Sequence, residues 1–292
     1  MIDSRAVTLA CFDDTAAFEG LDREAFTFTH QLLDHPALNL SNLGRVIPAL
    51  PKEQVFYSSG KLEKTDDFDR AHLDKKNGLS IEATIERIRV SDSYIMVRSP
   101  EADASFKDLY QALIADVTEL MQRRGVGDVP LDPMLYLFIA SPNSVTPFHV
   151  DRYSTFLMQF RGKKTVTVFP MFDERVVPSP ELEAFMSHDG RPTYRPESEA
   201  LATPFDFAPG QSVHIPFMAG HHVKNGSDDV SVSMSIIFNT AQTRAMSRAM
   251  MLNHSLRKRG LSPAPVGQSG WKDLGKALVY RSMSRVRRAI GR

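Results

Sequence analysis

The sequence predicts a mainly β fold with helices on either side of it. Residues 134–238 contain short apolar segments rich in β-branched and aromatic side chains, separated by Pro, Gly, Asn and Asp. This spacing is typical of a sandwich or barrel. Apolar residues recur at helical spacing both before and after this region. Strands are expected at residues 134–140, 148–150, 154–161, 164–169, 212–216 and 230–238.

The same patterns divide the chain into three expected parts. These are N-terminal α/β elements at 1–125, the barrel at 126–240, and basic C-terminal helices at 241–292. In the first part we expect helices at 22–35, 38–50, 80–89 and 106–124, a strand at 93–98, and a polar loop at 60–78. Residues 172–207, within the barrel, are rich in Pro, Glu and Ser. A long insertion is expected there, and it is a candidate lid.

The composition is that of a globular protein. Of the 292 residues, 42% are apolar and 24% are charged, close to the averages for soluble domains. No stretch approaches the roughly 18 apolar residues of a membrane span, and residues 1–14 lack the pattern of a secretory signal. A single cysteine, Cys11, excludes an intrachain disulfide and is expected to be a small packing residue. These features predict a cytoplasmic protein.

The net charge of zero conceals a basic C-terminal region. Residues 241–292 carry twelve Lys and Arg against one acid, Asp273, which leaves 23 basic and 34 acidic residues elsewhere. Helices are expected at 243–259 and 271–290, and one face of the second carries Val279, Met283, Val286 and Ile290. We expect this basic amphipathic helix to pack on the barrel or to form a homodimer. The alternative is peripheral contact with an anionic membrane or with nucleic acid.

His149 and Asp151 are candidate metal ligands. They lie two residues apart in an expected strand, so both side chains point to the same face. Such a pair alone is weak evidence, because it also occurs at surfaces and in cores. A turn at residues 217–220 then delivers His221 and His222. Two His and one Asp form a facial triad that leaves coordination positions open, as a non-haem Fe(II) requires.

Only one of His221 and His222 can be the third ligand, because neighbouring strand residues face opposite ways. We place His221 at the metal. His222 and His214 are expected to pack around the site or to support the ligands from behind.

Lys164 is a candidate partner for an anion. Strand alternation places it with Val166 and Val168 on the more apolar side. An inward ammonium group needs an anionic partner such as a bound carboxylate, because burying it unpaired costs several kcal/mol. The alternative is a strand-end lysine whose side chain reaches water. Thr146, three residues before His149, has a hydroxyl within reach of the same carboxylate.

Two blocks of residues together resemble a known family. The first is Thr-Pro-Phe-His-Val-Asp at 146–151, followed by Phe156, Gln159, Gly162, Lys164, Phe169 and Pro170. The second contains Pro209, Gly210, Ile215, Pro216, His221, Val223 and Asn225. Both are similar to the ligand segments of JmjC/cupin-type Fe(II)- and 2-oxoglutarate-dependent oxygenases. The resemblance includes the asparaginyl hydroxylases of the hypoxia-inducible factor and bacterial cupin-like hydroxylases, and it is specific over residues 134–239.

The resemblance implies a double-stranded β-helix, the jelly-roll cupin barrel, with helices packed around it. It implies that His149, Asp151 and His221, rather than His222, bind Fe(II). It further implies that Lys164 pairs with the distal carboxylate of 2-oxoglutarate and that Thr146 hydrogen-bonds to it. The implied reaction uses O2 and 2-oxoglutarate to hydroxylate a substrate, with release of succinate and CO2.

Two positions depart from the asparaginyl hydroxylases. Ser235 and Thr155 stand where those enzymes carry asparagine, near the cosubstrate and the substrate. The resemblance therefore does not extend to asparagine hydroxylation. Tyr136 and Phe138, on one face of an expected strand, either line the pocket or pack in the core. The substrate stays open, since a small molecule, a lipid-linked group and a protein side chain all fit the pattern.

Two other functions are compatible with the sequence. One is a non-catalytic cupin-fold binding or regulatory protein whose basic tail contacts nucleic acid or membrane. The other is a metal-dependent cupin that works without 2-oxoglutarate. The charge asymmetry supports the first of these. A complete ligand triad together with Lys164 favours the oxygenase, because a scaffold has no physical need for them.

Overall fold

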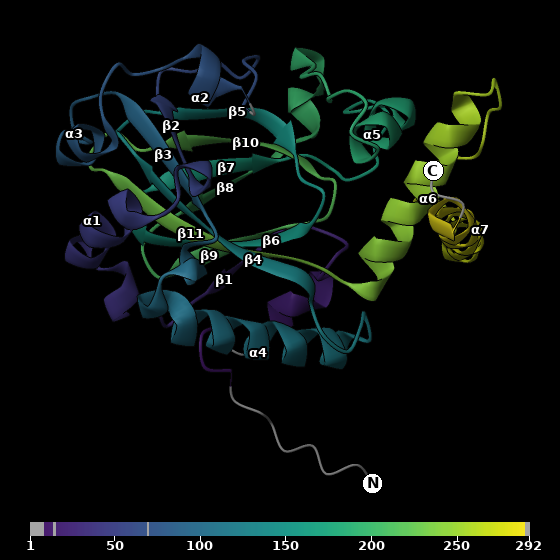
Figure 1. The fold of residues 1–292 in the computed structure, drawn as a ribbon, viewed down its shortest axis with the longest axis horizontal. Coiled ribbons are helices and arrows are strands. Elements are labelled where there is room, and N and C mark those ends of the chain that lie inside the picture. Colours follow the sequence, from purple (N-terminus) through teal and green to yellow (C-terminus); the bar gives the residue numbers. More distant parts are fainter. Residues whose placement is uncertain (1–8, 14–15, 69, 290–292) are drawn as a thin grey trace, which may run out of the picture.

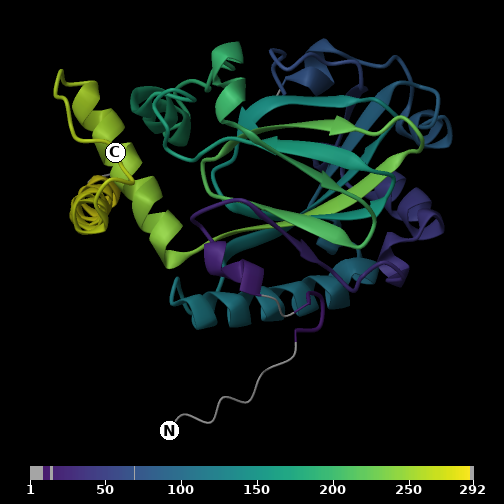
Figure 2. The same cartoon turned by 180° about the vertical axis from the view of Figure 1, so that it is seen from behind.

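Two antiparallel β-sheets lie face to face in the computed structural model, which describes residues 9–13, 16–68 and 70–289 (Figures 1 and 2). The larger sheet has the strand order β1 (Phe26–Thr29), β9 (Gln211–Ile215), β6 (Ser154–Arg161), β11 (Ser231–Asn239), β4 (Leu131–Ala140), β3 (Ser93–Arg98), β2 (Val55–Ser59). The smaller sheet has the order β5 (Val145–Val150), β10 (Gly220–Asn225), β7 (Lys164–Val168), β8 (Thr203–Phe207). The predicted mainly β class with flanking helices is confirmed.

Helices surround the two sheets. They are α1 (Leu40–Ala49), α2 (Ala71–Asp74), α3 (Ile81–Glu86), α4 (Lys107–Arg124), α5 (Ser179–Met186), α6 (Ala241–Arg257) and α7 (Gly270–Ala289). Figure 1 shows α4 running beneath the larger sheet and α6 and α7 standing at one side of the barrel. None of the helices in the described part of the chain combines the length and the apolar character needed to cross a membrane.

The six strands expected in the barrel are all present, and so are the strand at 93–98 and the helices near 38–50, 80–89 and 106–124. The helix expected at residues 22–35 is wrong, because the segment Phe-Thr-Phe-Thr forms β1 instead. Its alternating aromatic and β-branched residues suit a pleated strand. Thr27 pairs with Val213 of β9, and the ring of Phe28 packs against those of Phe12 and Phe156.

The segment 172–207 is more ordered than a long insertion loop. It contains α5, a 3-10 helix at Pro196–Leu201 and the edge strand β8, which pairs with β7. Polar composition hid this strand from the sequence pattern, because an edge strand needs no continuous apolar face. The last five residues of the segment therefore belong to the barrel.

The main core lies between the outer face of the larger sheet and α4. Leu109, Leu113, Val117 and Leu120, spaced by four and three residues, bury one side of the helix. In β11, Met234 and Ile236 belong to this core. The residues that alternate with them, Ser233 and Ser235, are buried on the opposite, inner face of the sheet. The barrel interior is therefore partly polar. The small size of these serine side chains leaves room for a binding pocket.

Asp116 of α4 ties the N-terminal segment to this core. Its buried carboxylate accepts hydrogen bonds from the backbone N–H groups of Ala10 (3.0 Å), Cys11 (2.7 Å) and Phe12 (3.3 Å). Burial and the adjacent Asp116 raise the pKa of the Cys11 thiol to about 12. The cysteine is therefore an unreactive packing residue, as the sequence predicted.

Replacing Asp116 by Ala is expected to lower the free energy of unfolding by about 2–4 kcal/mol, because three backbone donors lose their acceptor. Urea denaturation of the two proteins measures the difference. The matched control is Asp108→Ala on the exposed side of the same helix, which should cost less than about 1 kcal/mol. Equal losses in both variants would contradict the anchoring role.

Candidate metal centre

A pocket lies between the two sheets and receives side chains from both. Its aromatic wall consists of Phe68, Tyr94, Tyr136 and Phe138. The rings of Tyr136 and Phe138 stack with centroids 6.1 Å apart and planes inclined by 6°. Thr155 and Ser235, the two positions that depart from the asparaginyl hydroxylases, also line the pocket. Ser235 pairs with Tyr136 in the larger sheet, so this wall of the pocket carries polar groups beside its aromatic rings.

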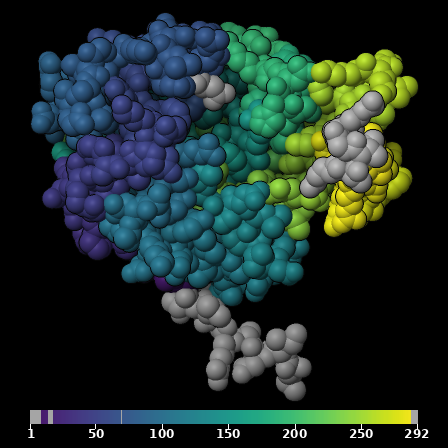
Figure 3. All heavy atoms as spheres, viewed as in Figure 1, coloured from purple at the N-terminus to yellow at the C-terminus, as the bar shows by residue number. Residues whose placement is uncertain are grey.

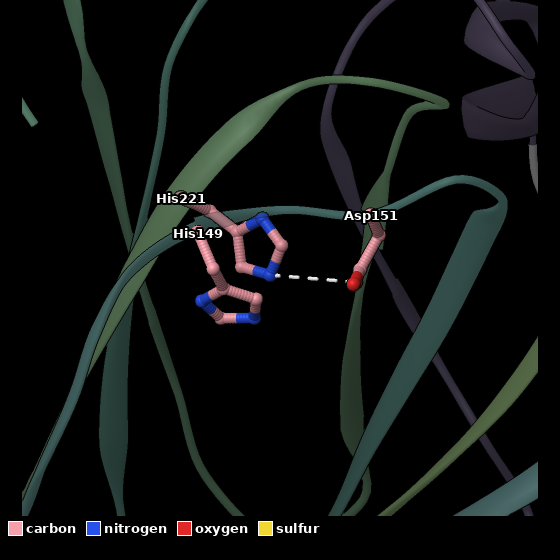
Figure 4. Close-up of side chains that lie close together, drawn as sticks. All are labelled: His149, Asp151 and His221. Atoms are coloured by element: carbon pink, nitrogen blue, oxygen red, sulfur yellow. Dashed lines mark ion pairs between the residues drawn. The ribbon is translucent and has the colours of Figure 1, made fainter. Parts of the chain in front are cut away.

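His149, Asp151 and His221 converge in this pocket (Figure 4). One potential ligand atom from each lies within 4.8 Å of the others, and no other group of three such residues occurs in the described part of the chain. Nε2 of His221 is 3.7 Å from Oδ2 of Asp151, and the two imidazole centroids are 4.1 Å apart. Two imidazoles and one carboxylate form a donor set that suits a divalent transition metal with open positions.

Hydrogen bonds to backbone carbonyl groups orient the imidazoles of His149 and His221 for metal binding. Nδ1 of His149 is 2.8 Å from the carbonyl oxygen of Pro147, and Nδ1 of His221 is 3.1 Å from that of Ala219. A carbonyl oxygen only accepts, so each Nδ1 carries the proton and each Nε2 keeps a free lone pair. Burial, with a smaller electrostatic contribution from neighbouring His149, lowers the pKa of His221 well below its usual value. His221 is therefore neutral, the form that binds metals.

The backbone of β5 explains how Thr146 comes to share the pocket with His149. In the pairing of β10 with β5, His221 lies opposite His149 but Val223 lies opposite Thr146, so the register shifts by one residue. This irregularity has the form of a β-bulge, which inserts one extra residue into a strand. Strict alternation would direct Thr146 and His149 to opposite faces. Because of the bulge, both line the pocket.

His222 and His214 face away from the three candidate ligands. Nε2 of His222 is 3.0 Å from Oε1 of Glu199 in the 172–207 segment. Burial raises the pKa of Glu199, but hydrogen bonds from Lys64, Tyr194 and His222 outweigh it and hold that pKa at about 2. His214 is fully buried in the larger sheet, where it contacts the backbone of Asp22 and Thr155. These two histidines pack around the site.

Lys164 lies inside the same pocket with its side chain buried. Its Nζ donates to Oγ of Ser233 at 2.7 Å. No carboxylate lies within 4 Å of this ammonium group in the described chain, and burial lowers its pKa to about 7. Oδ1 of Asn225 and Oγ1 of Thr155, on two other pocket residues, lack a hydrogen-bond partner within the described residues. A bound carboxylate would satisfy the cation.

Two tyrosines that the sequence did not reveal support the site. Tyr153 hydrogen-bonds to Asp151 and Tyr136, and Tyr94 hydrogen-bonds to Thr146. Burial and the negative charge of Asp151 raise the pKa of Tyr153, so the phenol keeps its proton and donates to the carboxylate. Tyr94 comes from β3, far from the barrel motifs in sequence, and no pattern near it signals this role.

A hollow of about 370 Å³ continues outward from His149 and Asp151. The 172–207 segment forms one of its walls through Phe185, His188, Arg191 and Pro192. Arg191 pairs with Asp67 across the hollow at 3.2 Å. The segment therefore borders the entrance to the candidate metal centre.

A family-model match agrees with the barrel. Residues 49–244 match the model of a family described as a cupin-like domain. Two structures of Escherichia coli ycfD, one of them titled a ribosomal oxygenase, align with 14% and 12% identity and TM-scores of 0.49 and 0.46. These alignments cover 89% of this chain but 64% and 63% of ycfD, less than two thirds of its length. A mutant of the Bacillus subtilis oxalate decarboxylase OxdC aligns with 18% identity and a TM-score of 0.27, over 46% of this chain and 29% of that one. No curated protein sequence matches.

Replacing Lys164 by Met is expected to stabilise the ligand-free protein by about 1–3 kcal/mol at pH 6, because it removes a buried charge at similar volume. Below pH 7 the Lys164 side chain is protonated in both the folded and the unfolded state, so the folded state bears the full free-energy cost of burying the charge. Between the folded-state pKa of about 7 and the ordinary lysine pKa of 10.5, Lys164 is protonated only in the unfolded state. The free energy of unfolding of the wild type therefore rises with pH in this range. The stability advantage of Lys164→Met over the wild type must therefore shrink towards pH 10.

Urea denaturation at several pH values measures this stability difference, with the exposed neighbour Lys163→Met as control. A pH-independent difference would count against a buried ammonium.

Proposed function

The chain belongs to the cupin-like domain family, and on this basis we propose that it is an Fe(II)- and 2-oxoglutarate-dependent oxygenase that hydroxylates its substrate. The observation that carries the proposal is the presence of two distinct features in one pocket. One is the open triad of His149, Asp151 and His221, and the other is the buried ammonium of Lys164. A triad alone suits many metal reactions. A cation deep in the same pocket is the added feature that a chelating dicarboxylate requires.

The donor set fits Fe(II), and three protein ligands leave room for a cosubstrate and O2. The metal, 2-oxoglutarate and O2 supply the oxidising chemistry, in which the cosubstrate becomes succinate and CO2 and the substrate gains a hydroxyl group. The protein's part is to bind, to orient and to exclude water. His149 and His221 are held by backbone carbonyls, and Asp151 is held by Tyr153.

Strand register gives the spacing between the metal and the cation. In the pairing of β10 with β7, His221 lies opposite Val168 and Asn225 lies opposite Lys164. The two functional positions are therefore four residues apart, roughly 13 Å along the strands. The long lysine side chain spans part of this distance. The remainder suits a short linear dicarboxylate with one end at the metal and the other at Nζ.

The aromatic wall gives the substrate a place beside the metal. Tyr136 and Phe138 present stacked rings, and Phe68 lies 4.6 Å from the ring of His149, measured between centroids. These rings exclude water from the metal on the side of the larger sheet. The hollow bordered by Arg191 and Phe185 gives access from outside.

The ligand assignment predicts that Fe(II) and then 2-oxoglutarate, added anaerobically to the apoprotein, produce the weak visible charge-transfer band of a chelate. His149→Ala, Asp151→Ala and His221→Ala should each lose the band and succinate formation, because the donor set becomes incomplete. The control is His254→Ala, which removes an imidazole paired with Asp189 at 3.0 Å on α6, outside the pocket. Iron binding without the band would indicate a cupin that works without 2-oxoglutarate. Binding of neither would favour the scaffold.

Lys164→Met should weaken 2-oxoglutarate binding by about 10- to 100-fold through loss of a charge-assisted hydrogen bond. A bound carboxylate raises the pKa of Lys164 from about 7, so binding to the wild type at pH 8 must take up protons. Calorimetry in buffers of different ionisation enthalpy measures that uptake. The variant should show none, whereas the exposed Lys163→Met should match the wild type. Unchanged affinity in Lys164→Met would show that another group holds the carboxylate.

A further inference from the structure

Helix α7 is a peripheral element that packs along α6, on the side away from the barrel (Figures 1 and 2). Its inner side carries small and polar residues together with half-buried Tyr280 and Met283. Ala277 is buried, and the buried carboxylate of Asp273 accepts a hydrogen bond from the backbone N–H of Gly267 at 2.9 Å. Nζ of Lys276 donates to the carbonyl of Ala264 at 2.6 Å. These contacts hold the helix in place, and its exposed large apolar residues take no part in them.

Those apolar residues lie on the outer side instead. Of the eleven exposed large hydrophobic side chains in the described chain, five belong to α7. They are Trp271 (76% exposed), Leu274 (54%), Leu278 (55%), Val279 (51%) and Val286 (59%). The sequence had placed Val279 and Val286 on one face with Met283, which is half-buried, and with Ile290, which lies outside the described residues. Exposed apolar patches of this kind mark binding surfaces.

Basic side chains border this apolar surface. Lys272, Arg281 and Arg285 are exposed on the same helix, and none has an acidic side chain within 4 Å among the residues that the structure describes. Burial and the positive charges of Arg244, Arg281 and Arg285 lower the pKa of Arg248 on α6. The arginines of the two helices therefore form one cluster of positive charge.

The nearby acids are already engaged elsewhere. Glu183 pairs with Arg257, and Asp189 pairs with Lys258 and His254. These contacts fasten α6 to the α5 segment and do not neutralise the outer side of α7. The surface thus combines unpartnered apolar residues with a local excess of positive charge.

We propose that the outer face of α7, formed by Trp271, Leu274, Leu278, Val279 and Val286 with Lys272, Arg281 and Arg285, docks on an anionic lipid bilayer. The apolar side chains enter the boundary between headgroups and acyl chains, and the basic side chains contact lipid phosphates. This inference is independent of the proposed oxygenase activity.

The chemistry of Trp271 and Lys272 favours a membrane surface. Trp is enriched where one end of the side chain is apolar and the other is wet. Nζ of Lys272 lies 5.4 Å from the centroid of the Trp271 ring, so the aromatic group and the cation are presented together. With 20 residues, α7 offers a contact line of about 30 Å parallel to the bilayer.

Charge complementarity argues against a second copy of the chain as the occupant. A two-fold contact brings the same patch onto itself, so Arg281 and Arg285 would face basic residues and no exposed acid of this helix. Like charges placed together oppose association. An anionic bilayer supplies the missing opposite charge over the whole face.

The test is co-sedimentation of the full chain with vesicles of phosphatidylcholine alone or mixed with phosphatidylglycerol. Binding should require the anionic lipid and weaken as salt is raised. Arg281→Glu with Arg285→Glu should reduce the partition coefficient by about tenfold or more. Trp271→Ser with Leu278→Ser should do the same through lost apolar contact. In the wild type, the emission of Trp271, the single tryptophan of the sequence, should shift to the blue when anionic vesicles are added.

The control replaces side chains of the same kinds far from this face, Arg87→Glu with Val90→Ser beside α3. Both are exposed, and α3 lies at the opposite end of the molecule (Figures 1 and 3). This variant should bind vesicles as the wild type does. Light scattering gives the oligomeric state of each protein. The proposal would be overturned if the wild type does not bind anionic vesicles. It would also be overturned if the wild type is a dimer that Trp271→Ser with Leu278→Ser dissociates while vesicle binding stays unchanged.

Discussion

The pairing of His149 with His221 across β5 and β10 is the constraint on which the rest of the site depends. Residues directly opposite in an antiparallel pair have side chains close together on one face, so the register itself brings the two imidazoles to 4.1 Å. Gly220 protects this register. A Cβ there would lie 2.6 Å from the ring of Phe148, so a larger residue would push β10 away from β5. Asp151 lies two residues after His149, so the two-residue period of a strand directs its side chain to the same face as the two imidazoles.

The bulge in β5 shows how much of the site the sequence could predict. His149, Asp151 and Lys164 follow simple alternation, and the residues alone indicated them. Thr146 does not, because the register shift that turns it into the pocket is a property of strand pairing. The sequence suggested it only through its closeness to His149 and through the family resemblance, and not through alternation. Tyr94 and Tyr153 were missed, since their roles arise from contacts that no local pattern encodes.

The errors in the fold have the same origin. The alternation of Phe and Thr in β1 covers only four residues, too few to be recognised as a strand within a segment whose pattern predicts a helix. Pairing with β9 nevertheless makes these residues a strand. On α7, helical periodicity allowed more than one inward face. The structure buries the face of Asp273 and Ala277 against α6, and this leaves Val279 and Val286 outside. Periodicity predicts a helix, but its partner decides which side is buried.

Charge balance connects the two ends of the pocket. With both ligand imidazoles neutral, a divalent metal, the Asp151 carboxylate and protonated Lys164 sum to two positive charges, and 2-oxoglutarate carries two negative charges. The proposed complex is therefore neutral inside a low-dielectric barrel, where any net charge is costly. Without metal and cosubstrate, Lys164 has only the hydroxyl of Ser233 as a partner, and burial lowers its pKa to about 7. Binding would give that lone cation an anionic partner, so the metal-loaded pocket, with its two positive charges, suits a dianion better than a neutral molecule of the same size.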